Sequence, residues 1–305
     1  MPADQTHGSV ASEQWLERVS AGGSLSREEL SALASDPDIL TIGMLADTVR
    51  RRLCGSTVTF LRVASVDVTT SATNDALPAT AQEARLTGTA ESLEQALAAV
   101  AAVRVSAGPR LVSGFAWADI ERWGGTAGGR AAALRALRSA GLDALAELPV
   151  ELGDGLPGAL SELAGEGLGT PRLTVTRAAP QHERLEQFLR TAPLLDRYPG
   201  IVAIAPLPLS LNALRPSTGY DDVKTVALAR LALPRVQHVQ LDWLRYGPKL
   251  AQVALTFGAD DIDNVSPSEE TPDGRRRGVV EELKKNIESA GFSAVERDGR
   301  FGVSA

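Results

Sequence analysis

Residues 219–263, GYDDVKTVALARLALPRVQHVQLDWLRYGPKLAQVALTFGADDID, decide the fold class of this chain. Apolar residues recur at helical spacing over about 221–233 and 247–257, which predicts two helices. Between them, polar and apolar residues alternate over 236–243, as they do in a strand with two different faces. A further short strand is expected near Asp260. Helices and strands that alternate in this way predict a parallel sheet joined by βαβ crossovers.

The same alternation extends toward the N-terminus. Helices separate the extended segments, which are predicted over 57–69, 110–115, 144–148, 171–176 and 201–206. Residues 70–89, TSATNDALPATAQEARLTGT, are small, polar and proline-containing, so a loop is expected there. About seven strands are found, and we interpret 105–109 as the remnant of a missing βα unit. We therefore predict an α/β fold, an incomplete or full TIM-type (β/α) barrel, with the incomplete barrel as the first choice.

Four regions follow from this pattern. They are a disordered lead (residues 1–11), an N-terminal helical cap (12–55), the barrel (56–263) and a C-terminal extension packed on the barrel (264–305). In the cap, Ser26 and Glu29 form a capping box that predicts the start of a helix. The next helix is expected to bury one stripe made of Leu40, Met44, Leu45 and Val49.

Composition excludes several classes of protein. The 305 residues are 44% hydrophobic, which suits a globular chain with a sizeable core. The net charge of -7 argues against a nucleic-acid partner, whose phosphates require a basic surface. No apolar run is long enough for a membrane span or a secretory signal. With one cysteine, Cys54, no intrachain disulfide can form, so a cytoplasmic location is expected.

Several stretches resemble one enzyme family. The pieces GYDDVKTVALARL, GPKLAQVAL and FGADDID, and the later AGFSAVERDGRF, are similar to the radical S-adenosylmethionine enzymes of the futalosine route to menaquinone. These are aminofutalosine synthase and the cyclic dehypoxanthine futalosine synthase, with deazaflavin synthase as a cousin. At the front, RVSAGGSLSREELSAL and DPDIL…LADTVRRRL resemble the opening helices of that family. The resemblance covers about half of the chain and implies a radical-enzyme barrel and a link to menaquinone biosynthesis.

The departures from the family fall on its chemistry. The family holds a 4Fe–4S cluster with three cysteines in a CxxxCxxC motif on the loop after the first strand, and Cys54 alone cannot supply three thiolates. The glycine-rich pair that follows the family's second strand has no counterpart here. Arg177 and Ala179 stand where the family has a histidine and a glutamate. We therefore predict a degenerate member without a cluster, in which S-adenosylmethionine binding is doubtful.

Polar residues at the C-terminal ends of barrel strands are the candidate site, because barrels bind ligands there. His238, Gln240 and Asp242 share one strand face, and His238 with Asp242 is the predicted catalytic acid–base pair. The alternative is a polar face that meets water. The predicted ligand-binding residues are Asp67, Thr69, Thr174, Thr176, Arg215, Gln240, Trp243, Asp260 and Asp263.

Each of these candidates has a plainer interpretation. The hydroxyl groups are often loop caps, and Trp243 is a candidate for core packing as well as for stacking on a ligand. Asp260 and Asp263 lie in the turn that borders the family's active site, where they are expected to hold ligand hydroxyls; no metal site is predicted. Arg215 precedes a helix and suits an anion. Cys54 has no histidine or second cysteine near it in the sequence, so a packed thiol is expected.

Two functions follow. The first is a pseudoenzyme or accessory protein of the futalosine route, which binds a nucleoside-like ligand or an enzyme of that pathway and carries no cofactor. The alternative is an active, metal-independent enzyme that uses acid–base residues in the barrel lumen. Neither a nucleic acid nor a membrane is an expected partner, and oligomerisation is left open.

Overall fold

The computed structural model describes residues 5–70, 76–210, 218–268 and 278–303. The barrel strands are β1 (Thr57–Asp67), β2 (Glu83–Thr87), β3 (Leu111–Ala116), β4 (Ala144–Glu147), β5 (Arg172–Val175), β6 (Ala203–Pro208), β7 (His238–Asp242) and β8 (Asp261–Val265). The helices that accompany them are α4 (Leu93–Ala107), α5 (Trp117–Gly124), α6 (Ala127–Ala140), α7 (Leu156–Gly165), α8 (Gln181–Arg197), α9 (Gly219–Ala232) and α10 (Trp243–Leu255), with a 3-10 turn, η1 (Val150–Gly155), before α7.

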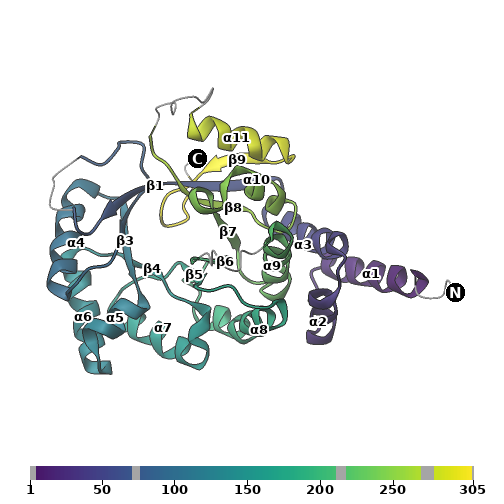
Figure 1. Ribbon diagram of the computed structural model, residues 1–305, viewed down its shortest axis with the longest axis horizontal. Helices are drawn as coiled ribbons and strands as arrows, with labels where there is room; N and C mark the ends of the chain where they lie inside the picture. Colours follow the sequence, from purple (N-terminus) through teal and green to yellow (C-terminus); the bar gives the residue numbers. More distant parts are fainter. Residues whose placement is uncertain (1–4, 71–75, 211–217, 269–277, 304–305) are drawn as a thin grey trace.

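The eight strands are parallel and form a nearly closed barrel. Their order is β4-β3-β2-β1-β8-β7-β6-β5, and the helices surround them (Figure 1). The two ends of this path, β4 and β5, are joined by isolated bridges, Ala144 with Gly169 and Pro149 with Thr174, rather than by a continuous ladder. The predicted TIM-type architecture is therefore confirmed, with a weak seam between β4 and β5.

The eighth strand lies where the sequence pattern predicted a loop. β2 falls inside residues 70–89 and pairs with both neighbours, Val63 of β1 facing Glu83 and Glu83 facing Leu111 of β3. Residues 105–109, interpreted as the remnant of a lost unit, are the end of α4 and the turn after it. The prediction failed because Glu83 and Arg85 read as solvated charges, whereas both are buried in the barrel.

Three helices, α1 (Gln5–Ser20), α2 (Arg27–Ser35) and α3 (Ile39–Cys54), form the N-terminal cap beside α8 and α9. Helix α1 begins at Gln5, earlier than the expected start near residue 12. The predicted capping box is present, since Ser26 Oγ accepts from the amide of Glu29 and the Ser26 amide donates to Glu29 Oε2. In α3 the buried stripe differs from the prediction, because Leu40 and Met44 are 69% and 60% exposed.

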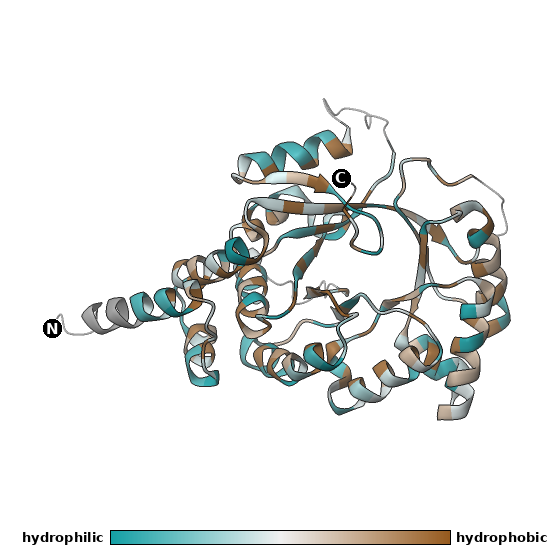
Figure 2. Ribbon diagram, turned by 180° about the vertical axis from the view of Figure 1, so that it is seen from behind, coloured by the Kyte–Doolittle hydropathy of each residue, from teal (hydrophilic) through white to brown (hydrophobic). Residues whose placement is uncertain are grey.

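The C-terminal region adds a strand beside β1, outside the path of the eight barrel strands. It contains α11 (Val279–Ser289), whose mixed polar and apolar surface is visible in Figure 2, and β9 (Ser293–Glu296). Strand β9 runs parallel to the first half of β1, from Thr57 beside Ser293 to Phe60 beside Glu296. The chain then turns inward beneath β1 (Figure 1). Among the helices of the described ranges, none is long and apolar enough to cross a membrane.

Candidate functional site

The two ends of the barrel are named here by the strand ends that form them. The floor holds the N-terminal ends of the strands, and the mouth holds their C-terminal ends. Between them the lumen is filled by a set of polar side chains, the lumen network, which consists of Glu83, Arg85, Arg172, Gln240, Asp261, Asp263 and Arg297.

Two aspartates organise the lumen network. Asp261 accepts hydrogen bonds from Arg297 Nε at 2.6 Å and Nη2 at 2.8 Å, and from Gln240 Nε2 at 2.7 Å. Asp263 accepts from Arg85 at 2.8 and 3.0 Å and also pairs with Arg172. Burial alone would raise the pKa of Asp263, but Arg172 and Arg85 outweigh it and hold this pKa well below its usual range. These carboxylates are therefore already neutralised by guanidinium groups.

Above the network lies the mouth pocket, a cavity of about 550 Å³. This volume suits a small organic ligand. The side chains around it are mainly hydroxyls, amides and charged groups of both signs. They include Ser65, Thr87, Phe115, Asp119, Glu147, Arg172, Thr174, Gln240, Asp242, Arg245 and Asn264, and Gly88 adds a backbone position.

Among the residues that the structure describes, two groups of the mouth pocket have no hydrogen-bond or ion-pair partner. Thr174 Oγ1 is buried and makes no hydrogen bond. The Glu147 side chain, at the end of β4, forms no hydrogen bond or ion pair within the described ranges. Burial raises the pKa of Glu147, and the charge of Arg172 offsets this only in part. A buried hydroxyl and a carboxyl group without partners are available to a ligand.

The backbone at the mouth is also unusual. Phe115 and Asn264 have φ values of 62° and 59°, in the left-handed region that residues other than glycine rarely occupy. The ring of Phe115 is fixed by an edge contact with Trp123, with centroids 5.2 Å apart. Such strain costs on the order of 1–3 kcal/mol at each residue and is typical of ligand sites. Neither this conformation nor the partnerless groups can be seen in the sequence.

The predicted catalytic pair does not form. His238 is the first residue of β7 and Asp242 the last, so about 13 Å of strand separates them, at roughly 3.3 Å per residue. His238 lies at the floor, where it hydrogen-bonds Asp260. Asp242 lies at the mouth, accepts from the backbone amide of Arg245 at 2.9 Å and thereby caps α10. The shared strand face was predicted from the alternating pattern, but that pattern did not show that the two residues reach opposite ends of the barrel.

The predicted ligand-binding residues are divided among several places. Thr174 and Gln240 line the mouth pocket as expected. Asp263 also borders it, but its carboxylate is already paired with Arg85 and Arg172. Trp243 packs in the hydrophobic core and does not line the mouth pocket. Thr176 lies outside the mouth pocket, where its backbone amide donates to Glu151. Arg215 falls outside the described residues.

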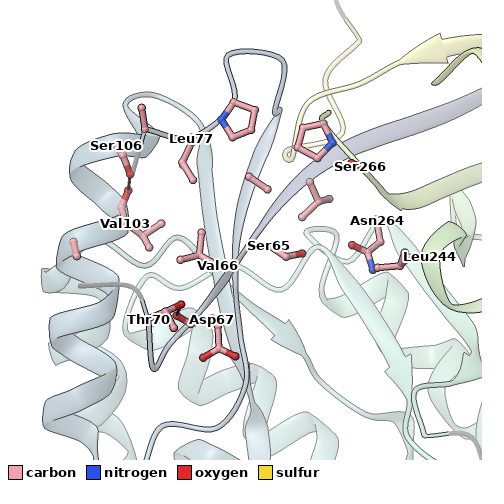
Figure 3. A pocket seen from close by; sticks show the side chains of 16 residues that line it. Ser65, Val66, Asp67, Thr70, Leu77, Val103, Ser106, Leu244, Asn264 and Ser266 are labelled. Carbon is pink, nitrogen blue, oxygen red and sulfur yellow. Dashed lines mark hydrogen bonds between the residues drawn. The ribbon is translucent and has the colours of Figure 1, made fainter. Parts of the chain in front are cut away.

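Asp67 lines a second cavity, and Thr69 forms a turn with it at the edge of that cavity. Asp67 accepts from the Thr69 amide at 2.8 Å and from its hydroxyl at 2.6 Å, which is a capped turn at the end of β1. The neighbouring side pocket, about 530 Å³, lies between β1, α4 and residues 264–267 (Figure 3). It shares Ser65 and Asn264 with the mouth pocket. Asp67 therefore lines the side pocket rather than the lumen.

Asp260 and Cys54 differ most from their predicted roles. Asp260 faces the floor, where it pairs with Arg230 and hydrogen-bonds His238 Nδ1 at 2.7 Å. Cys54, expected to be a packed thiol without a nearby histidine, donates to Asp260 Oδ2 at 3.1 Å. Burial, followed by the charge of Asp260, raises the pKa of the Cys54 thiol to about 12. Burial alone would lower the pKa of His238, but the hydrogen bond to Asp260 and the negative charges of Asp260 and Asp261 together outweigh it, so this pKa is raised.

Comparison with known proteins agrees with this architecture. The CofH/MqnC C-terminal region family matches residues 210–304, which include α9, β7, α10, β8, α11 and β9. An aminodeoxyfutalosine synthase of Streptomyces coelicolor is 37% identical over 93 residues, 28% of this chain and 24% of the relative. The cyclic dehypoxanthine futalosine synthase of the same organism is 29% identical over 154 residues, 44% of this chain and 39% of the relative. This chain is a homologue of the futalosine-pathway radical S-adenosylmethionine enzymes.

An enzyme of another reaction and several solved structures are similar as well. A 5-amino-6-(D-ribitylamino)uracil–L-tyrosine 4-hydroxyphenyl transferase of Archaeoglobus fulgidus is 32% identical over 133 residues. The match covers 39% of this chain and 38% of that enzyme, so this chain spans less than two fifths of each of these three relatives. Among solved structures, methylornithine synthase has a TM-score of 0.65 at 14% identity, covering 92% of this chain and 97% of that chain. The FeFe-hydrogenase maturase of Carboxydothermus hydrogenoformans has 0.67 at 12%, covering 97% and 82%. Both likenesses show the fold alone.

The residues of this homologue do not fit the cluster that the resemblance implies. The segment between β1 and β2, VTTSATNDALPATAQ, contains no cysteine. The single thiol, on Cys54, lies at the floor, at the opposite end of the barrel from the loop that follows β1. A 4Fe–4S cluster requires several thiolates on one side of a site. After β2, a single glycine, Gly88, stands between Thr87 and Thr89 in the wall of the mouth pocket.

Proposed function

We propose that this protein is a cluster-less, radical-enzyme-like member of the futalosine route to menaquinone, a pseudoenzyme or accessory protein that binds a nucleoside-like ligand in the mouth pocket. The observation that carries the proposal is the contrast at one end of the barrel. The mouth keeps an open polar cavity with partnerless groups, whereas the loop after β1 offers no thiolate. We expect neither a 4Fe–4S cluster nor catalytic use of S-adenosylmethionine.

The chemistry of the pocket supports a nucleoside-like ligand. Hydroxyl and amide groups, such as Ser65, Thr174 and Asn264, suit the hydroxyls of a sugar. Phe115 also lines the pocket, and its ring packs against Trp123 in the hydrophobic core. The charged side chains of the wall are nearly balanced in sign, which favours a polar but weakly charged ligand. They are Arg85, Arg172, Arg245, Asp119, Glu147, Asp242 and Asp263.

The test combines binding with iron analysis. Isothermal titration of the full chain with adenosine and with aminodeoxyfutalosine is expected to show one site, whereas free ribose binds far more weakly. Anaerobic reconstitution with iron and sulfide is expected to give no stoichiometric cubane spectrum. A loaded cluster that cleaves S-adenosylmethionine would overturn the pseudoenzyme proposal. Failure of both nucleosides to bind would overturn the ligand class.

Binding to a pathway enzyme is the second part of the proposal. Leu40 and Met44 lie one turn apart on α3, and both are mostly exposed, which favours contact with another protein. Co-expression with the aminodeoxyfutalosine synthase of the same cell, followed by affinity purification, is expected to recover a complex. The double variant Leu40→Lys with Met44→Lys is expected to lose it. Unchanged recovery from the variant contradicts a contact at α3.

An active acid–base enzyme is the second candidate, and Glu147 is the observation that favours it. Its raised pKa and its position at the end of β4 suit a general acid or base at the mouth. Mass spectrometry of a bound nucleoside would then show conversion without added iron. Glu147→Gln is expected to abolish this conversion. Loss of conversion in His238→Gln with retention in Glu147→Gln would contradict the role of Glu147.

A further inference from the structure

Three side chains of different chemistry meet at the barrel floor. They are Cys54 from the end of α3, His238 from the start of β7 and Asp260 from the residue before β8. Their thiol, imidazole and carboxylate each offer one atom, and these atoms lie within 4.8 Å of one another. Both Cys54 Sγ and His238 Nδ1 contact the same oxygen, Asp260 Oδ2, at 3.1 and 2.7 Å. This set, the floor site, is remote from the mouth pocket.

We propose that Cys54, His238 and Asp260 form a binding site for a zinc-class divalent cation. Zinc is bound in proteins by thiolate, imidazole and carboxylate groups, at about 2.3 Å from sulfur and 2.0–2.2 Å from nitrogen or oxygen. In a tetrahedral site these bond lengths place the ligand atoms roughly 3.3–3.8 Å apart. The observed separations at Asp260 Oδ2 need to open by less than about 1 Å to reach this geometry. Three protein ligands leave a fourth position for water.

The ligands are held in place by their surroundings. Asp260 Oδ1 is occupied by the guanidinium of Arg230 and by the backbone amide of Val239 at 2.8 Å, so Oδ2 is the oxygen directed at the thiol and the imidazole. The ring of His238 stacks on Phe301, with centroids 5.2 Å apart. Such outer contacts orient metal ligands and are typical of built sites.

Access and charge narrow the choice of ion. The side chain of Asp260 is buried, but that of His238 is 18% exposed and Cys54 is half-buried, so an ion can enter from this side. Arg230 already neutralises part of the carboxylate charge. A hard cation such as Mg²⁺ or Ca²⁺, which relies on several oxygen ligands, gains little here. A thiolate and an imidazole instead favour a softer ion such as Zn²⁺ or Co²⁺.

Cobalt provides a direct test, because Cys54 is the single cysteine of the chain. Titration of chelator-treated full chain with Co²⁺ is expected to produce a thiolate-to-metal charge-transfer band that saturates at one ion per chain. Zn²⁺ is expected to displace it. Cys54→Ser should abolish the band and weaken Zn²⁺ binding at least tenfold in competition with a chromophoric chelator. His238→Gln should weaken Zn²⁺ binding by a similar factor.

The matched control is His182→Gln, which removes an exposed histidine at the start of α8 and should change neither the band nor the affinity. Circular dichroism of Cys54→Ser and His238→Gln establishes that both variants are folded before titration. Absence of the charge-transfer band in the unmodified chain overturns the proposal. Stoichiometric Zn²⁺ binding that is equal in the unmodified chain and in Cys54→Ser also overturns it.

Discussion

The floor and the mouth of the barrel pair their polar groups differently. At the floor and in the lumen, Arg297, Asp261 and Asp260 are buried and hydrogen-bonded on several sides. At the mouth, Thr174 and Glu147 line an open cavity and have no side-chain partner within the described part of the chain. Two of the segments that resemble the radical enzymes, FGADDID and AGFSAVERDGRF, contribute to the floor and the lumen. In such barrels the N-terminal ends of the strands stabilise the fold, and the C-terminal ends carry the active site. The resemblance in these two segments therefore concerns the scaffold more than the chemistry.

Disrupting the lumen network should have the largest effect on stability. Arg297→Ala leaves Asp261 buried without its guanidinium partner and is expected to lower the free energy of unfolding by about 3–5 kcal/mol. Urea denaturation followed by circular dichroism measures this loss. The control is Arg300→Ala, three residues later, whose side chain is 53% exposed and should contribute less than about 1 kcal/mol. Equal losses in the two variants would mean that the lumen network does not stabilise the fold.

Acid should weaken the same network. The pKa values of Asp260 and Asp263 are lowered below the ordinary 3.8 in the folded chain, so their contribution to stability is complete above that value and is lost as the pH falls below it. The free energy of unfolding, measured in urea from pH 7 to pH 3, is expected to fall steeply below about pH 4. Asp263→Asn should reduce that slope. An unchanged slope in this variant would assign the acid sensitivity to other carboxyl groups.

At the mouth, Thr174→Val separates ligand binding from stability. Replacing a hydroxyl that has no partner by a methyl group should be neutral or stabilising by up to about 1 kcal/mol, since no hydrogen bond is lost. Nucleoside affinity should fall by roughly fivefold, the effect of one hydrogen bond. Thr170→Val is the matched control, because Thr170 Oγ1 is also buried without a partner but lies away from the mouth pocket. If Thr170→Val weakens nucleoside binding as much as Thr174→Val does, the ligand does not contact Thr174.

The smallest effect is expected from Glu147→Gln. Burial raises the pKa of Glu147 in the folded chain, so ionisation of this residue at neutral pH costs stability. The amide should raise the melting temperature by about 1–3 °C at pH 7. At pH 4, where the carboxyl group is mostly protonated, the difference should vanish. Differential scanning calorimetry at the two pH values measures this, and a gain that persists at pH 4 contradicts the assigned cause.

The sequence predicted the repeating units well. The pattern of residues 219–263 located α9, β7, α10 and β8 to within a few residues, because helical and strand periodicities differ. The sequence pattern of residues 70–89 did not reveal β2. The partners of Glu83 and Arg85 come from distant strands, and these contacts place both charged side chains in the lumen. Local patterns also cannot show that Cys54 meets Asp260, 206 positions later. The contents of the mouth and of the floor site depend on such long-range contacts.

The parallel pairing of β1 with β9 also bears on how the chain reaches its native state. As the nascent polypeptide leaves the ribosome, the first half of β1 has one edge that stays unpaired until Ser293–Glu296 has been synthesised. Contacts so distant in sequence form slowly, and exposed strand edges invite aggregation meanwhile. Folding of this barrel on the ribosome is therefore expected to finish only after Ser293–Glu296 has left the ribosome, and until then the unpaired edge of β1 is open to chaperones.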